Sequence, residues 1–389
     1  MAPWDVYAKE LSIFSRGHAV LNPRRSILQD GSGLRPAVDV GNVVYNLEGQ
    51  LIRLFNCLRP REQQDADCVF PHDFEVLRIA RSSEDDESCF REINIQAGFY
   101  RPGPFISKGV KSLKAEAVAS ATSEDDARLS FSTHHEQGAV LLTTGRVLSR
   151  QSPNRPSFER YLIQHFDSWC ALLESAELDI RPEDLMLITG LDKTESWSNI
   201  CFEESWVQGE FTVDVPSVDS VDFSPGAGVN TYHACSAFSD SGPNPEDMEV
   251  RIHLPSGHDD GKLLSDDERV NQVIFVRALR GKKRNFNKGV KVVGNAGSGG
   301  VSDDAPPSDD GSSYISVESI GDTQHRDDYM IPVLDFILEE FPNVDMAIVH
   351  DDDYAVHNQH MQAPSGLVRR RLENGIMIGR SSSLNVDRF

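Results

Sequence analysis

The sequence predicts an α+β fold, with antiparallel β-structure predominating before residue 150 and a few helices packed on a sheet in the C-terminal half. Three observations indicate this. The segments 38–47 and 51–58 are β-rich and flank Glu48-Gly49-Gln50, which predicts a hairpin. Apolar residues recur at helical spacing over 156–176 and again over 331–341. The continuous apolar run Leu185 to Ile188 is typical of a strand buried on both faces.

The remaining elements of the first half are also interpreted as β. The chain opens with a short apolar stretch, 11–14, and Pro and Gly break the pattern after it. Strands are expected at 74–79 and 105–119. A second hairpin is expected from 129–132 and 138–144, with its tip at 133–137.

The second half begins with the long helix over 156–176. Pro156 suits its first turn, where a missing N–H is tolerated, and Glu159 complements the positive end of the helix dipole. Short strands are expected after Ile188; their expected ranges are 211–215, 232–238, 272–279, 290–293 and 344–349.

Composition limits the classes of protein. The chain has 389 residues, 39% hydrophobic residues and a formal net charge of −23, which suits a large globular core and argues against nucleic-acid binding, because phosphate repels an acidic surface. No apolar run approaches the roughly 20 residues of a transmembrane helix. The six cysteines are scattered with no C-x-x-C pair, as expected in a reducing intracellular compartment.

Five regions follow from these patterns. They are a β-rich region 1–150, an α+β region 151–294, a disordered linker 295–313 of Gly, Ser, Asp and Pro, a helix–strand element 314–360 packed on the core, and a disordered tail 361–389.

The loop expected over 189–207 is one candidate site. Thr189-Gly190 is interpreted as the end of the buried strand, with Asp192, Lys193 and Thr194 following in a polar loop. On the structural interpretation, Trp197 anchors the loop on the sheet, Asp192 accepts backbone N–H groups and Lys193 stays in solvent. On the alternative interpretation, this run is a binding site.

The densest collection of potential metal ligands is His350-Asp351-Asp352-Asp353, directly after an expected strand. Carboxylates suit calcium or magnesium and imidazole suits zinc, so His350, Asp351 and Asp353 are candidate ligands. The competing interpretation is an acidic surface turn. No nucleophile–base motif is recognised, and no cofactor is expected.

A basic cluster spans 280–288 and includes Arg280, Lys282, Lys283, Arg284 and Lys288. It is consistent with a nuclear import signal, an anchor for an acidic partner, or a solvated hairpin end. A cytoplasmic location is expected, with a nuclear one as the alternative.

Several segments resemble an uncharacterised family of fungal proteins. They are Gly41-Asn42-Val43 to Phe55-Asn56, Thr189 to Thr194 with Trp197, Phe275-Val276-Arg277, and the acidic run after Val349. Family members usually carry Asp at the position of Asn42 and Cys at that of Leu191. The resemblance implies a fungal intracellular origin and a single co-folding unit, and it transfers no catalytic residue.

Three functions are therefore weighed. The first is a non-enzymatic interaction or regulatory protein with an unknown protein partner. The second is a metal-dependent hydrolase or phosphotransferase using the cluster 350–353. The third is a pore-forming or membrane-attached protein that inserts the β-segments 105–119 and 129–144.

Overall fold

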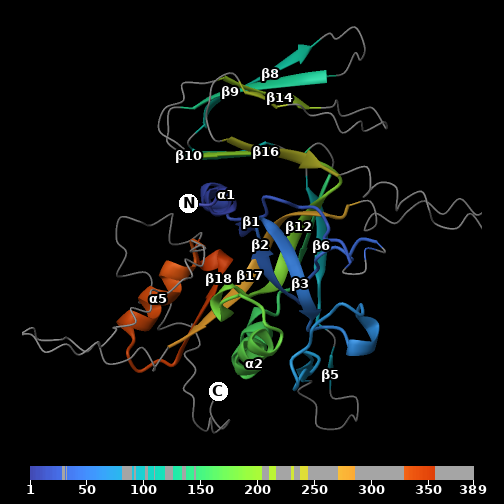
Figure 1. Ribbon diagram of the computed structural model, residues 1–389, viewed down its shortest axis with the longest axis vertical. Coiled ribbons are helices and arrows are strands. Elements are labelled where there is room, and N and C mark those ends of the chain that lie inside the picture. The colour runs from blue at the N-terminus through green and yellow to red at the C-terminus, as the bar shows by residue number, and fades with distance from the viewer. Residues whose placement is uncertain are drawn as a thin grey trace, which may run out of the picture.

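The structure is a computed structural model. It describes residues 1–28, 31, 33–80, 90–91, 93–100, 104–108, 110–118, 126–133, 137–143, 146–203, 210–215, 229–231, 237–243, 270–284 and 328–354. The predicted α+β class is confirmed: antiparallel sheets carry a few helices (Figure 1). The expected linker 295–313, the tail 361–389 and the strand 290–293 lie outside the described residues.

An antiparallel pair, β12 (Met186–Thr194) and β17 (Gln272–Lys283), forms the centre of an eight-stranded sheet. Every residue of β12 is buried, as are the first ten of β17, so both faces of this pair are covered. The other strands of this sheet are β1 (His18–Ala19), β2 (Asn42–Leu47), β3 (Gln50–Asn56), β6 (Gln96–Tyr100), β11 (Val147–Gln151) and β18 (Met346–His350).

The predicted buried strand at Leu185–Ile188 and the hairpin β2–β3 are present, but the predicted loop over 189–207 is wrong. The strand continues to Thr194, and β13 (Trp197–Glu203) begins after two intervening residues. Register shifts at Ile188/Gly190 and Asp192/Lys193 let β12 stay paired with β17. Polar residues were expected to end the strand, but here they are buried against partners of opposite charge.

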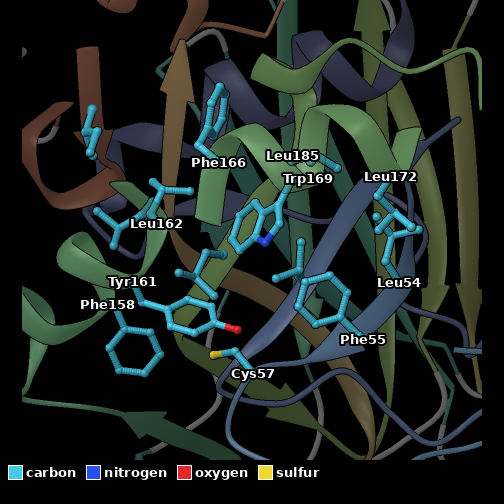
Figure 2. Close-up of a cluster of buried hydrophobic side chains, with 14 of the residues drawn as sticks. Leu54, Phe55, Cys57, Phe158, Tyr161, Leu162, Phe166, Trp169, Leu172 and Leu185 are labelled. Atoms are coloured by element: carbon cyan, nitrogen blue, oxygen red, sulfur yellow. The ribbon is translucent and has the colours of Figure 1, made fainter. Parts of the chain in front are cut away.

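The helix α2 (Arg155–Ser175) confirms the predicted long helix and covers one face of the central sheet. Figure 2 shows its Tyr161 and Trp169 directed toward Phe55 and Cys57, and the rings of Phe55 and Trp169 meet edge to face at 5.8 Å. Burial of such aromatic side chains contributes several kcal/mol each, on the order of 25 cal/mol per Å². The helix therefore fixes the β2–β3 hairpin onto the sheet.

Two further helices complete the main core. The predicted C-terminal helix is present as α5 (Ile331–Glu340), and it packs with Ala347 and Val349 of β18, whereas Met346 and Ile348 belong to the cluster under α2. Since alternate strand residues change faces, α5 and α2 lie on opposite faces of β18. Three short 3-10 turns are η1 (Ser12–Phe14), η2 (Arg61–Gln63) and η3 (Pro182–Asp184).

The first helix, α1 (Pro3–Leu11), was not predicted. Its apolar stripe, which includes Val6, Tyr7 and Leu11, is short, and Pro3 stands at its N-terminus. All three residues are buried between the central sheet and a second sheet. Tertiary packing rather than intrinsic propensity therefore accounts for this helix.

Two four-stranded sheets lie beyond α1 (Figure 1). The inner sheet has the order β16-β13-β10-β7, and the outer sheet has the order β15-β14-β9-β8. Their strands are β7 (Phe105–Ile106), β8 (Val110–Val118), β9 (Asp126–Thr133), β10 (Gln137–Thr143), β14 (Glu210–Val215), β15 (Val229–Thr231) and β16 (Ala237–Gly242), with β13 given above.

Three strand predictions are corrected here. The expected strand 105–119 is divided between β7 in the inner sheet and β8 in the outer sheet. The expected hairpin of 129–132 with 138–144 is wrong, because β9 pairs with β8 and β14 while β10 pairs with β7 and β13. The expected strand 74–79 is reduced to β4 (Ile79–Ala80), which pairs with β5 (Phe90–Arg91). Within the described residues, no helix combines the length and apolar character needed to cross a bilayer.

Candidate functional site

Asp192 is the centre of a buried polar cluster in the central sheet. Its side chain is fully buried. It accepts hydrogen bonds from both terminal nitrogens of Arg277 at 3.1 Å, from the Ser149 hydroxyl at 2.7 Å and from the Tyr100 hydroxyl at 3.1 Å. Arg16 also forms an ion pair with Asp192, with its Nη1 3.5 Å from the carboxylate. The prediction that Asp192 accepts backbone N–H groups of a turn is therefore wrong.

Hydrogen bonds from three side chains and the ion pair with Arg16 satisfy this buried carboxylate and explain why the strand can carry it. Burial, together with the negative charge of Asp192, raises the pKa of Tyr100, which stays a protonated donor. The cluster joins β6, β11, β12 and β17, all strands of one sheet, so its role here is to hold that sheet together.

The neighbours of Asp192 are buried as well. Lys193 is 6% exposed, so the prediction that it stays in solvent is wrong. Trp197 is buried as predicted, and its Nε1–H donates to Gln272 Oε1 at 3.2 Å. Thr194 donates its hydroxyl proton to the carbonyl of Ser196 at 3.2 Å. These residues form a tight strand-to-strand connection rather than an open loop.

Arg280, the first member of the predicted basic cluster, is fully buried in a second cluster. Its Nη1 lies 2.6 Å from Asp351 Oδ1 and its Nε lies 3.1 Å from Asp328 Oδ2. Asp351 also accepts a hydrogen bond from the backbone N–H of Ala278 at 2.8 Å. Burial opposes the charge of Arg280, but Asp328 and Asp351 outweigh it and raise its pKa.

The basic residues after Arg280 also have internal partners. Lys282 pairs with Asp335, Lys283 pairs with Asp167, and Arg284 donates to the carbonyl of Phe341. Lys288 lies outside the described residues. The described part of the cluster thus fastens β17 to α5 and α2.

His350 lies between the two clusters in a geometry that defines its protonation state. Thr189 donates its hydroxyl proton to the carbonyl of Arg277 at 3.0 Å, so its oxygen receives the Nε2–H of His350 at 2.7 Å. Nδ1 accepts the backbone N–H of Asp352 at 3.1 Å. The imidazole is therefore neutral, and burial together with the nearby Arg155 lowers its pKa to about 3.

The three predicted metal ligands are directed to different partners. His350 faces Thr189, Asp351 faces Arg280, and Asp353 forms a two-point ion pair with Arg155 at 2.6 and 3.1 Å. Across the described ranges, no group of three or more His, Cys, Asp or Glu side chains is arranged to hold a metal ion. The metal site stays a prediction, and the test is whether Zn²⁺, Mg²⁺ or Ca²⁺ raises the melting temperature.

Two long hairpins together form the inner and outer sheets, and their strands have the same side-by-side arrangement in both sheets. One hairpin pairs β7 with β10 in the inner sheet and β8 with β9 in the outer sheet. The other pairs β13 with β16 and then β14 with β15. The two hairpins are neighbours throughout, because β10 pairs with β13 and β9 pairs with β14. Each hairpin therefore begins and finishes in the inner sheet, and its middle part belongs to the outer sheet.

The register of the outer sheet separates apolar from polar positions. Residues paired across an antiparallel sheet share a face, and alternate residues change faces. The rows on one face are Leu113–Phe131–Phe211, Ala115–Leu129–Val213 and Ala117–Ala127–Val215, and the rows on the other are Ser112–Ser132–Glu210, Lys114–Ser130–Thr212 and Glu116–Arg128–Asp214.

The inner sheet is covered on both faces. Ala139, Leu141 and Cys201 belong to the cluster that includes α1. Val140 and Ile200, which alternate with them, are 1% and 2% exposed. In Figure 1 the outer sheet lies over the inner sheet on the side away from α1. Sequence reasoning missed these layers, because the strand alternation was visible but the change of sheet along each hairpin was not.

Comparison of the chain with models of known families, with curated proteins and with solved structures found no match. The resemblance to an uncharacterised fungal family therefore stays a prediction.

Proposed function

We propose that this chain is a membrane-inserting protein whose two long hairpins leave the outer layer and extend together into a bilayer. The observation that carries the proposal is the shared order of the two hairpins in the inner and outer sheets, with apolar and polar positions separated in the outer one. The proposal keeps the non-enzymatic character expected from the sequence and replaces the unknown protein partner by lipid.

The length of strands β8 and β9 and the pattern of the outer sheet support this role, whereas β14 and β15 are described over only 6 and 3 residues. β8 and β9 have 9 and 8 residues, close to the roughly 9–11 residues that a tilted strand needs to cross the apolar core of a bilayer. Membrane-spanning strands alternate between lipid-facing apolar and water-facing polar positions. The rows that contain Leu129 and Val213 suit the lipid side, and those that contain Ser130 and Thr212 suit the water side.

The topology supports an extension of this kind. In each hairpin, the two strands that belong to the inner sheet can stay paired there. The strands of the outer sheet can then move away together, with the hydrogen bonds between them intact. Unpaired backbone groups in lipid cost several kcal/mol each. Several copies must therefore pair through β8 and β15, the edge strands of the outer sheet, before the sheet is stable in a membrane.

Release of a trapped dye from vesicles tests the proposal. Phosphatidylcholine vesicles are suitable because the net charge of −23 opposes anionic lipid. We expect micromolar protein to release the dye at a pH between 5 and 8. Vesicles that stay intact over this whole range contradict the proposal.

A matched pair of substitutions on adjacent residues locates the inserting surface. Leu129→Lys adds a charge to the apolar face, where a Lys costs about 2–4 kcal/mol at the middle of a bilayer, and Ser130→Lys adds the same charge to the polar face. We expect the first to abolish leakage and the second to preserve it. Val213→Lys, in register with Leu129 on the second hairpin, repeats the test, and circular dichroism verifies that each variant is folded. Equal effects at 129 and 130 would exclude an amphipathic inserting sheet.

A further inference from the structure

A shallow pocket lies where the segments after β1 and before β2 meet β3 and the start of β17, and its empty space of about 380 Å³ includes open solvent. Its apolar lining consists of buried side chains of the core, among them Val38, Leu51 and Val273. Four arginines, Arg24, Arg25, Arg35 and Arg53, complete its wall with Asn22, Ser26 and Asn271, and among the residues that the structure describes no carboxylate lines it. This is unusual for a chain with a net charge of −23.

Arg24, Arg35 and Arg53 have carboxylate partners outside the pocket lining. Arg24 binds Asp240 at 2.6 Å, Arg35 binds Asp67 at 3.4 Å and Arg53 binds Asp65, each through a terminal nitrogen. These ion pairs hold the guanidinium groups in place.

The ion pairs leave part of each guanidinium without a partner. The Nε atoms of Arg24, Arg35 and Arg53 are buried, and no acceptor for them exists among the described residues. Arg35 and Arg53 are each only 9% exposed. Buried N–H groups are nearly always hydrogen-bonded, so these three unpaired donors leave the arginine wall of the pocket incompletely satisfied.

Positive neighbours act on Arg53, one of the arginines of the pocket. Burial lowers the pKa of Arg53, and the neighbouring positive charges of Arg35 and Arg59 lower it further, against the opposing effect of Cys68. A bound anion would oppose this effect of the neighbouring positive charges on Arg53.

We propose that this pocket binds a phosphate group carried by a small molecule or a lipid. A phosphate ester presents three strong acceptor oxygens and close to two negative charges, which suits a wall that carries four arginines. The guanidinium fork is the protein group best suited to phosphate oxygens.

This inference is independent of membrane insertion, and binding is measured without any leakage assay. The probe is pyrophosphate, titrated into the full-length protein by calorimetry and by thermal denaturation, with sodium chloride at matched ionic strength as the salt control. We expect saturable binding and a rise in melting temperature that chloride does not reproduce.

Two pocket variants and one control make the site specific. Arg53→Gln removes a buried donor, and Arg25→Gln removes the charge of a half-buried residue whose loss leaves the core intact. Each is expected to weaken the affinity for pyrophosphate about tenfold or more. Arg181→Gln, a partly exposed arginine that pairs with Asp184 outside the pocket, is expected to leave it unchanged.

Vesicles distinguish the two sources of phosphate. If pyrophosphate binds in solution, the pocket takes a soluble phosphate ligand. If only vesicles containing a phosphorylated phosphatidylinositol retain the protein on sedimentation, and Arg25→Gln and Arg53→Gln abolish this, the phosphate belongs to a lipid headgroup. Binding of neither probe, or equal binding by the pocket variants and Arg181→Gln, overturns the proposal.

Discussion

At the scale of single residues, the polar side chains that the sequence suggested as site residues instead form buried ion pairs within the central sheet. Asp192 and Asp351 are each fully buried and each pairs with an arginine of β17. Their partners, Arg277 and Arg280, stand three residues apart, with Ala278 between them donating its backbone N–H to Asp351. A buried carboxylate is tolerated only where such donors surround it.

His350 predicts how stability depends on pH. Its folded-state pKa, about 3, lies below its ordinary value of 6.5. As pH falls below about 6.5, the unfolded chain binds a proton that the folded chain does not, so stability falls between about pH 6.5 and pH 3. One proton corresponds to about 1.4 kcal/mol per pH unit. Burial lowers the pKa of His18 as well, which acts in the same direction.

Urea denaturation at pH 8 and pH 5 measures this effect. In His350→Gln the side-chain amide can still bond Thr189, but the titrating group is gone. We expect the variant to lose about 2 kcal/mol less than wild type between the two pH values. Identical pH profiles would show that His350 is protonated in the folded protein.

Asp192 predicts a large effect of a small change. Asp192→Asn keeps the shape of the side chain but leaves the guanidinium of Arg277 buried without its counter-charge, which costs about 3–5 kcal/mol. Asp167→Asn is the matched control: Asp167 pairs with Lys283 but is 77% exposed, and an exposed pair contributes less than about 1 kcal/mol. Chemical denaturation of both variants compares them. Similar losses contradict the structural role of Asp192.

At the scale of elements, the sequence predicted what depends on local periodicity and missed what depends on distant partners. The helix α2 has a long apolar stripe and was predicted within about a residue at each end. The end of β12 was misplaced, because the partners that allow Asp192 to be buried come from β6, β11 and β17. None of these contacts has a signal near position 192 in the sequence.

The hairpins show the same limit in another form. Alternation identified the residues of β9 and β10 as strands, but alternation is the same whether a chain stays in one sheet or changes to the next. The arginine pocket was missed because its members come from segments after β1, before β2 and within β3, each with an ordinary number of basic residues. Such a constellation exists only after folding.

Trp197 tests the connection between β12 and β13. The ring is buried in the cluster that includes α1 and Phe275, and Gly242 lies so close that an added Cβ would stand 2.7 Å from the indole nitrogen. Trp197→Ala is expected to destabilise the protein by about 3–5 kcal/mol. Phe336→Ala, an aromatic residue that is 39% exposed on α5, is expected to change stability on the order of 0.5 kcal/mol. A small loss at Trp197 in urea denaturation would mean that the ring does not anchor this connection.

At the scale of the whole molecule, a central sheet held by buried ion pairs is joined to two hairpins held by apolar packing. The central sheet is held by buried ion pairs that link distant segments: Arg280 alone joins β17 to Asp328 and Asp351. The two hairpins are attached to it through α1 and the inner sheet (Figure 1). Breaking a buried ion pair costs several kcal/mol, whereas layers held by apolar contacts separate where lipid replaces those contacts. The proposed insertion therefore leaves the central sheet folded and moves only the hairpin ends.

This division predicts opposite consequences for two buried apolar residues on neighbouring strands of the inner sheet. Ile200 alternates with residues that face α1 and so lies on the face toward the outer sheet, whereas Leu141 packs in the cluster with α1; both are at most 2% exposed. Truncation of either to Ala costs about 2–5 kcal/mol. Ile200→Ala weakens the closed arrangement of the two layers, and each 1.4 kcal/mol lost there raises the fraction of open molecules about tenfold. Leu141→Ala weakens the whole fold without favouring the open form.

We therefore expect Ile200→Ala to release dye from vesicles about tenfold faster than wild type, and Leu141→Ala to show no gain in rate although its melting temperature falls as far. Leakage at equal protein concentration and melting temperature, measured on the same preparations, separate the two effects. If both variants leak faster, general destabilisation explains the leakage. If neither does, the contact between the two sheets does not control insertion, and the hairpin ends are not the part that moves.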